Sequence, residues 1–126
     1  MLAPVPLVAS GCGGGGVATP DTPTAGVTTT ASSGLVITIT SAGVTPKHLV
    51  VNAGSQVTFI NNDSIAHLMF SDPHPEHTDC PELNQVGFLD PGQSRQTGNL
   101  DTARTCGFHD HNLFANTSLQ GSLTIQ

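Results

Sequence analysis

Short apolar and β-branched runs, separated by turn residues, recur from residue 35 to the end of the chain. In QVTFIN, residues 56–61, one face would carry Val57, Phe59 and Asn61, and the other Gln56, Thr58 and Ile60, which is the alternation of a strand. No long stretch repeats apolar residues at helical spacing. We expect strands at the following residues: 35–40, 48–51, 56–61, 67–70, 87–89, 94–99, 104–109 and 122–126. These seven or eight short strands predict an all-β fold, a Greek-key β-sandwich or barrel.

The first part of the chain lacks this pattern. Residues 13–34 consist mainly of Gly, Thr, Ser and Pro, and cannot bury enough apolar surface to offset their ordering entropy. Residues 1–12 carry a short apolar run that ends in Ala-Ser-Gly-Cys and resembles the end of a bacterial lipoprotein signal, although no Lys or Arg precedes the run. We therefore expect a signal segment at 1–12 with lipidation of Cys12, a tether at 13–34 and a folded domain at 35–126, held outside the cytoplasm in the periplasm or at the cell surface.

The charge pattern argues against two kinds of partner, nucleic acids and anionic membrane surfaces. The formal net charge is −6 at pH 7, and the cations are Lys47, Arg95 and Arg104. A nucleic-acid binder needs clustered cations to displace counterions from phosphates, and an anionic membrane surface makes the same demand. We therefore expect no nucleic-acid partner, and membrane contact through a lipid anchor alone.

Histidines mark the candidate chemistry. Imidazole suits copper, zinc and nickel, and a thiolate with two imidazoles suits copper in an electron-transfer site. In CGFHDH, residues 106–111, an unbroken strand would put His109 and His111 on one face and Cys106 on the other. If the strand instead broke near Gly107, Cys106 and His109 could turn onto one metal ion.

The cysteine count favours a different arrangement. If Cys12 carries lipid, Cys80 and Cys106 remain, and two cysteines in a small extracytoplasmic domain form a disulfide by default. Such a bridge would draw the long loop that contains His74 and His77, in HPEH, towards His109 and His111. The metal site would then consist of histidines only. Both the thiolate site and the histidine-only site with a Cys80–Cys106 disulfide are open at this point.

The domain resembles the cupredoxins over nearly all of residues 35–126. VTPKHLVVNAGSQVTFINNDSIAH is similar to the family's first half, in which a strand precedes an Ala-Gly turn, a strand that ends in Asn, and a His. LDPGQS, CGFH and QGSLTIQ are similar to its second half. The resemblance implies a two-sheet Greek-key sandwich of plastocyanin-like type, with one copper near one end.

The resemblance also implies a ligand set. By position, the family's first His, its Cys and its second His correspond to His67, Cys106 and His109. The weak axial Met of the electron-transfer members has no counterpart, because Leu119 stands in its place. The extra His111 and the HPEH loop indicate a divergent, histidine-rich branch.

We expect a copper-binding protein, with one-electron transfer through a mononuclear copper and a redox partner protein, rather than an enzyme. The first alternative is a histidine-only copper site with the Cys80–Cys106 bridge, which would hold copper or carry out type 2 copper redox catalysis. The second alternative is a metal-free β-sandwich that serves as an interaction module.

Overall fold

The computed structural model describes residues 35–126. The expected signal segment, the lipidated Cys12 and the tether lie outside these residues and stay predictions. Within residues 35–126, no helix is long and apolar enough to cross a membrane.

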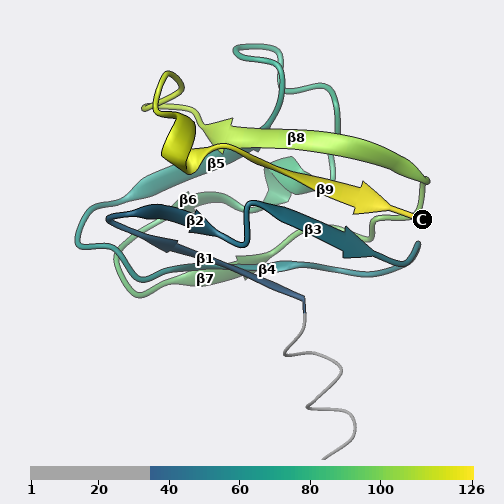
Figure 1. The fold of residues 1–126 in the computed structure, drawn as a ribbon, viewed down its shortest axis with the longest axis horizontal. Coiled ribbons are helices and arrows are strands. Elements are labelled where there is room, and N and C mark those ends of the chain that lie inside the picture. Colours follow the sequence, from purple (N-terminus) through teal and green to yellow (C-terminus); the bar gives the residue numbers. More distant parts are fainter. Residues whose placement is uncertain (1–34) are drawn as a thin grey trace, which may run out of the picture. The chain divides into compact units, whose positions relative to one another are not determined.

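Nine strands form in this part of the chain and pair into two sheets (Figure 1). Their bounds are β1 Val36–Thr40, β2 Gly43–Thr45, β3 His48–Val51, β4 Thr58–Asn61, β5 His67–Ser71, β6 Gly87–Leu89, β7 Ser94–Gln96, β8 Arg104–Asp110 and β9 Gly121–Ile125. One sheet has the order β2-β1-β4-β7 and the other β3-β9-β8-β5-β6. The predicted all-β sandwich is confirmed, and β2, which pairs antiparallel with β1, is the strand that the sequence pattern did not indicate.

The core lies between the two sheets and follows the alternation of the strands. In β4, Phe59 and Asn61 are buried while their neighbours are partly exposed. Phe59 meets Phe108 of β8 edge to face, with ring centroids 5.2 Å apart, so the two sheets contact through aromatic rings. The predicted pattern of residues 56–61 therefore places the correct face inward.

Strand β8 runs unbroken through Gly107 and ends at Asp110. Gly107 keeps its place in the ladder opposite Ser122 of β9, so the chain does not turn there. Cys106 and Phe108 belong to the buried core, and alternation sends His109 to the other face of the same strand. One face of β8 thus contributes Cys106 and Phe108 to the core, and the opposite face carries His109.

The loop that follows β5 covers the outer face of this sheet. In Figure 1 it rises on the side of β8 that faces away from the four-stranded sheet. Its backbone is attached to β8 through a hydrogen bond from the Asp72 N–H to the Gly107 carbonyl, at 2.9 Å. His109 is only 3% exposed although it lies on the outer face, which we attribute to this cover.

Candidate metal centre

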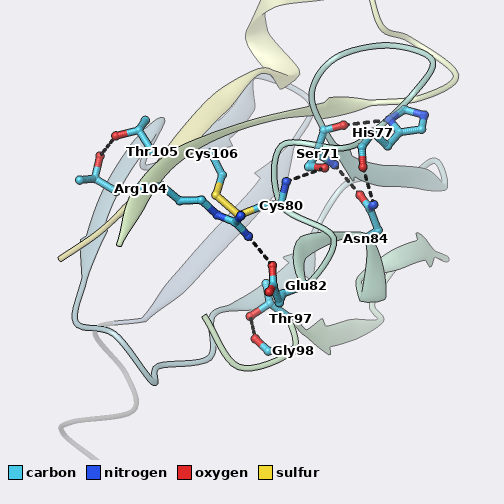
Figure 2. Close-up of a disulfide and its surroundings, with 11 residues drawn as sticks. Ser71, His77, Cys80, Glu82, Asn84, Thr97, Gly98, Arg104, Thr105 and Cys106 are labelled. Carbon is cyan, nitrogen blue, oxygen red and sulfur yellow. Dashed lines mark hydrogen bonds and ion pairs between the residues drawn. A yellow bond between two sulfur atoms is a disulfide. The ribbon is translucent and has the colours of Figure 1, made fainter. Parts of the chain in front are cut away.

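A disulfide joins Cys80 to Cys106, with their Cα atoms 5.7 Å apart (Figure 2). Both cysteines are fully buried. A disulfide sulfur is not a thiolate, so Cys106 offers no ligand to a metal ion in this structure. The thiolate arrangement that the resemblance implied is therefore not formed, because β8 continues straight through Gly107 and Cys106 faces the core.

Four imidazoles gather on the outer face of β8, where they form a group that we call the histidine cluster: His74, His77, His109 and His111. One ring nitrogen from each lies within 4.8 Å of those of the others. Two of the rings come from the loop after β5, and two from the end of β8 and the residue that follows it. This spacing is short enough for one metal ion to draw the four nitrogens together.

Two fixed oxygens set the direction of two of these rings. The Nδ1 of His77 donates to the carbonyl of Ser71 at 2.8 Å, since a carbonyl only accepts (Figure 2). The Nδ1 of His109 donates to Oδ1 of Asp72 at 2.6 Å. In both rings Nε2 therefore carries the lone pair, and the Nε2 of His77 accepts a hydrogen bond from Nδ1 of His111 at 2.9 Å.

Two nitrogens of the cluster are buried without a hydrogen-bond partner in the part of the chain that the structure describes. They are Nε2 of His109 and Nδ1 of His74. Buried polar atoms are nearly always paired, so each exception needs an explanation. A metal ion that uses both lone pairs explains the two exceptions together, and the donor set therefore fits a metal.

The environment also keeps His74 in the form that a metal requires. Burial of the ring lowers the pKa of His74, and the nearby His111, His109 and His77 lower it further, while Glu76 opposes them. A neutral imidazole is the form that binds metal ions. The ring of Phe114 stacks on His74, with centroids 4.1 Å apart and planes 7° from parallel, and so restricts its position.

His67 does not join the cluster. Its Nδ1 lies 2.7 Å from Oδ2 of Asp110, and its Nε2 lies 2.9 Å from Oδ2 of Asp63. The hydrogen bond from His67 is the main reason why the pKa of Asp63 is lowered. Both ring nitrogens of His67 thus face carboxylates, and neither is directed at the histidine cluster.

The contacts of His67 also show why the implied ligand set does not form. The residue of β8 that touches His67 is Asp110, which lies further along the strand than Cys106. Leu119, in the place of the axial Met, is a buried hydrocarbon side chain and offers no donor. Asp110, placed by sequence between two histidines of the cluster, therefore supports a third histidine on the opposite face.

Sequence reasoning missed Asp72 and Phe114 as neighbours of the cluster. Asp72 follows β5 directly, but its contact with His109 depends on the pairing of β5 with β8. Phe114 lies in a loop without a periodic pattern, and it reaches His74 only because the two loops meet in space. The sequence contained no local signal for either contact.

Comparisons with known proteins agree with this architecture. No protein-family model matches the sequence, and no curated protein matches it. Among solved structures, a purple cupredoxin from Nitrosopumilus maritimus matches with a TM-score of 0.53 and 17% identity, over 72% of this chain and 98% of that chain. The oxidized form of plastocyanin from Dryopteris crassirhizoma matches with a TM-score of 0.55 and 20% identity, over 72% and 99% of the two chains.

An amicyanin mutant in its Cu(I) form matches with a TM-score of 0.56 and 18% identity, over 73% of this chain and 81% of that chain. At these identities the likeness is one of fold. Residues 35–126 of this chain adopt the cupredoxin fold.

Proposed function

We propose that this chain binds one copper ion through the histidine cluster and holds it outside the cytoplasm. The observation that carries the proposal is the convergence of four imidazole nitrogens within 4.8 Å, among them the buried and unpartnered Nε2 of His109. The ligand set is therefore the histidine-only alternative, with Cys80 and Cys106 in a disulfide.

Copper is the metal that the donors and the fold favour together. Imidazole binds copper, zinc and nickel, and copper stands at the top of the affinity order for divalent ions of this series. One of the structures that match this fold is a Cu(I) form of amicyanin. That likeness is one of fold, and it supports the proposal only in combination with the imidazoles.

The protein's own residues prepare the site before the ion arrives. The Ser71 carbonyl and the Asp72 carboxylate hold protons on the Nδ1 atoms of His77 and His109, so that both Nε2 lone pairs point into the cluster. His77 and His111 hydrogen-bond to each other in the metal-free protein, so a metal ion held by both of these nitrogens would replace that hydrogen bond. Bound copper would supply one-electron chemistry between Cu(I) and Cu(II).

One-electron transfer with a partner protein is the second candidate function. Its support is that the matching plastocyanin is an oxidized form and the matching amicyanin is a Cu(I) form. Copper holding stands first, because three of the four imidazoles lie outside the strands and the site has no thiolate. The buried disulfide supports an oxidising compartment, since such bridges are rare in the cytosol.

The test is a Cu(II) titration of the full chain that carries Cys12→Ser, with thiols counted on the same sample. We expect one bound copper, no reactive thiol after unfolding, and weak visible absorption. An intense visible band from thiolate-to-copper charge transfer, as a blue-copper Cys–His₂ site produces, would contradict the histidine-only site. Absence of copper binding would contradict the proposal as a whole.

Further measurements separate the candidate roles. For copper holding, the ion should leave to a competing chelator in both oxidation states. Electron transfer instead requires repeated cycling between Cu(II) and Cu(I) with the ion retained. A type 2 copper enzyme would show an exchangeable water ligand in magnetic resonance spectra and would turn over an oxygen or nitrogen species.

A further inference from the structure

We infer that Asp72 is the residue that positions His109 for the metal, and that Gly107 is a glycine because the Asp72 carboxylate occupies the space beside it. The inference rests on the proposed copper site. Its starting point is the 2.6 Å contact between Oδ1 of Asp72 and Nδ1 of His109. Histidine ligands commonly donate their second ring nitrogen to a carboxylate, which fixes the ring orientation and the tautomer.

The backbone of Asp72 is held on both sides. Its N–H donates to the Gly107 carbonyl at 2.9 Å, which extends the pairing of β5 with β8 by one residue. Its carbonyl accepts from the N–H of Asp79 at 2.8 Å, which closes the loop back on itself. The carboxylate therefore projects from a fixed point of the sheet and not from a free loop.

Gly107 lies on the same face of β8 as His109, two residues before it. A Cβ at this position would overlap Oδ2 of Asp72 and lie 2.9 Å from its Cγ. The φ angle of Gly107 is not in the left-handed region, so the backbone itself does not require glycine here. The requirement is for space, and the group that fills this space is the carboxylate beside His109.

A contribution to folding does not explain this carboxylate. The side chain of Asp72 is 43% exposed, and ion pairs with this exposure contribute little to stability. Among residues 35–126, the hydrogen-bond partner of the carboxylate is His109. The contact therefore serves the ring: it keeps the Nε2 lone pair of His109 directed at the cluster.

The experiment uses the full chain with Cys12→Ser and compares Asp72→Ala and Asp72→Asn with Asp79→Asn. The last variant is a matched control, because Asp79 is an exposed acid of the same loop and its removal changes the net charge equally. The measurements are the Cu(II) dissociation constant, the ring ¹⁵N shifts of His109 without metal, and the stability of the metal-free protein.

We expect Asp72→Ala to weaken copper binding by about 10- to 100-fold and Asp72→Asn by about tenfold, the range found for partners of metal-bound histidines. Without metal, Asp72→Ala should release His109 from the single Nδ1–H tautomer, while the stability stays close to that of the unsubstituted protein. Asp79→Asn should change none of these properties. Equal loss in the Asp72 and Asp79 variants would overturn the inference.

A double-mutant cycle tests Gly107 separately. Gly107→Ala should weaken copper binding when Asp72 is present and have little further effect in Asp72→Ala, because the carboxylate to be displaced is then absent. Equal effects in both backgrounds would mean that Gly107 acts through folding alone, which would overturn its part of the inference.

Failure of this inference and failure of the proposed function give different results. If the unsubstituted protein binds copper and Asp72→Ala binds it equally well, the positioning role is wrong and the copper site stands. If neither the unsubstituted protein nor any variant binds copper, the proposed function is wrong. The metal-free ¹⁵N spectrum then still shows whether Asp72 orients His109.

Discussion

Removal of the Cys80–Cys106 bridge should destabilise the protein strongly without abolishing copper binding. The perturbation is the double variant Cys80→Ala and Cys106→Ala in the Cys12→Ser background. The bridge spans 26 residues, and the loss of chain entropy on closing a loop of this length corresponds to about 3.5 kcal/mol at 25 °C. The free energy of unfolding should fall by about this amount from chain entropy, and further through the lost packing of the two buried sulfurs.

The assay is urea unfolding of the metal-free protein, followed by a Cu(II) titration under conditions where the variant is folded. Reduction of the protein that keeps both cysteines is the matched control, since it opens the bridge without removing the buried sulfur atoms. The difference between the reduced protein and the alanine variant then measures the lost packing of the two sulfurs.

Either of two results would contradict this expectation. A loss of less than about 1 kcal/mol on reduction would mean that the bridge does not constrain the unfolded chain as its length implies. Complete loss of copper from a folded double variant, with copper retained by the reduced protein, would mean that a cysteine sulfur binds the ion, because the bridge is open in both proteins and only the sulfurs differ. Retained but weaker binding is the expected outcome, since the bridge ends the loop that carries His74 and His77.

Three further perturbations separate the parts of the site. His67→Ala should leave copper binding in place but lower the free energy of unfolding by about 1–3 kcal/mol in a urea titration, because Oδ2 of the buried Asp110 loses its partner while Oδ1 still accepts from backbone N–H groups. Loss of copper would instead make His67 a ligand. Since burial lowers the pKa of His74 below its usual 6.5, the unfolded chain binds more protons than the folded protein below that pH. The stability of the metal-free protein should therefore fall as the pH drops below about 6.5, and His74→Ala should show a shallower fall; an equal slope would contradict the assignment. Phe114→Ala should weaken copper binding by about 2- to 10-fold through the lost stacking on His74, with little change in stability, whereas Phe88→Ala, at another exposed phenylalanine, should leave the affinity unchanged.

Much of the fold followed from local pattern, because alternation in a strand is a local property. The alternation of residues 56–61 predicted which side chains of β4 face the core. The same argument showed that, if the strand continues, His109 and His111 share one face and Cys106 lies on the other. What local pattern did not decide was whether the strand continues past Gly107.

That decision depends on neighbours that are distant in sequence. Gly107 stays in the strand because β9 pairs with it on one side and Asp72, directly after β5, bonds to its carbonyl on the other. Single-residue preference cannot supply this information, since glycine by itself suggests a break. The disulfide alternative, by contrast, came from counting cysteines, which needs no knowledge of the fold.

The implied role of His67 shows the limit of a resemblance carried over by position. His67 does lie at the start of β5, as the pattern implied. The side chains that meet it come from Asp63 in the preceding turn and from Asp110 at the end of β8. The positions of the motifs along the chain did not show which residue of β8 lies beside His67. In the structure it is Asp110 and not Cys106.

The alternation of β8 has a consequence for the order in which folding, disulfide formation and metal binding can occur. Its inward-facing Cys106 and Phe108 complete the sandwich and its bridge, whereas His109 on its outer face, and His111 just after the strand, are not part of that hydrophobic core. Folding and oxidation can therefore finish first, and the metal can arrive last, at a surface that is already built. Under the proposed function, the protein could be exported empty, wait in a metal-poor environment without unfolding, and load or release its ion repeatedly while the sandwich stays intact.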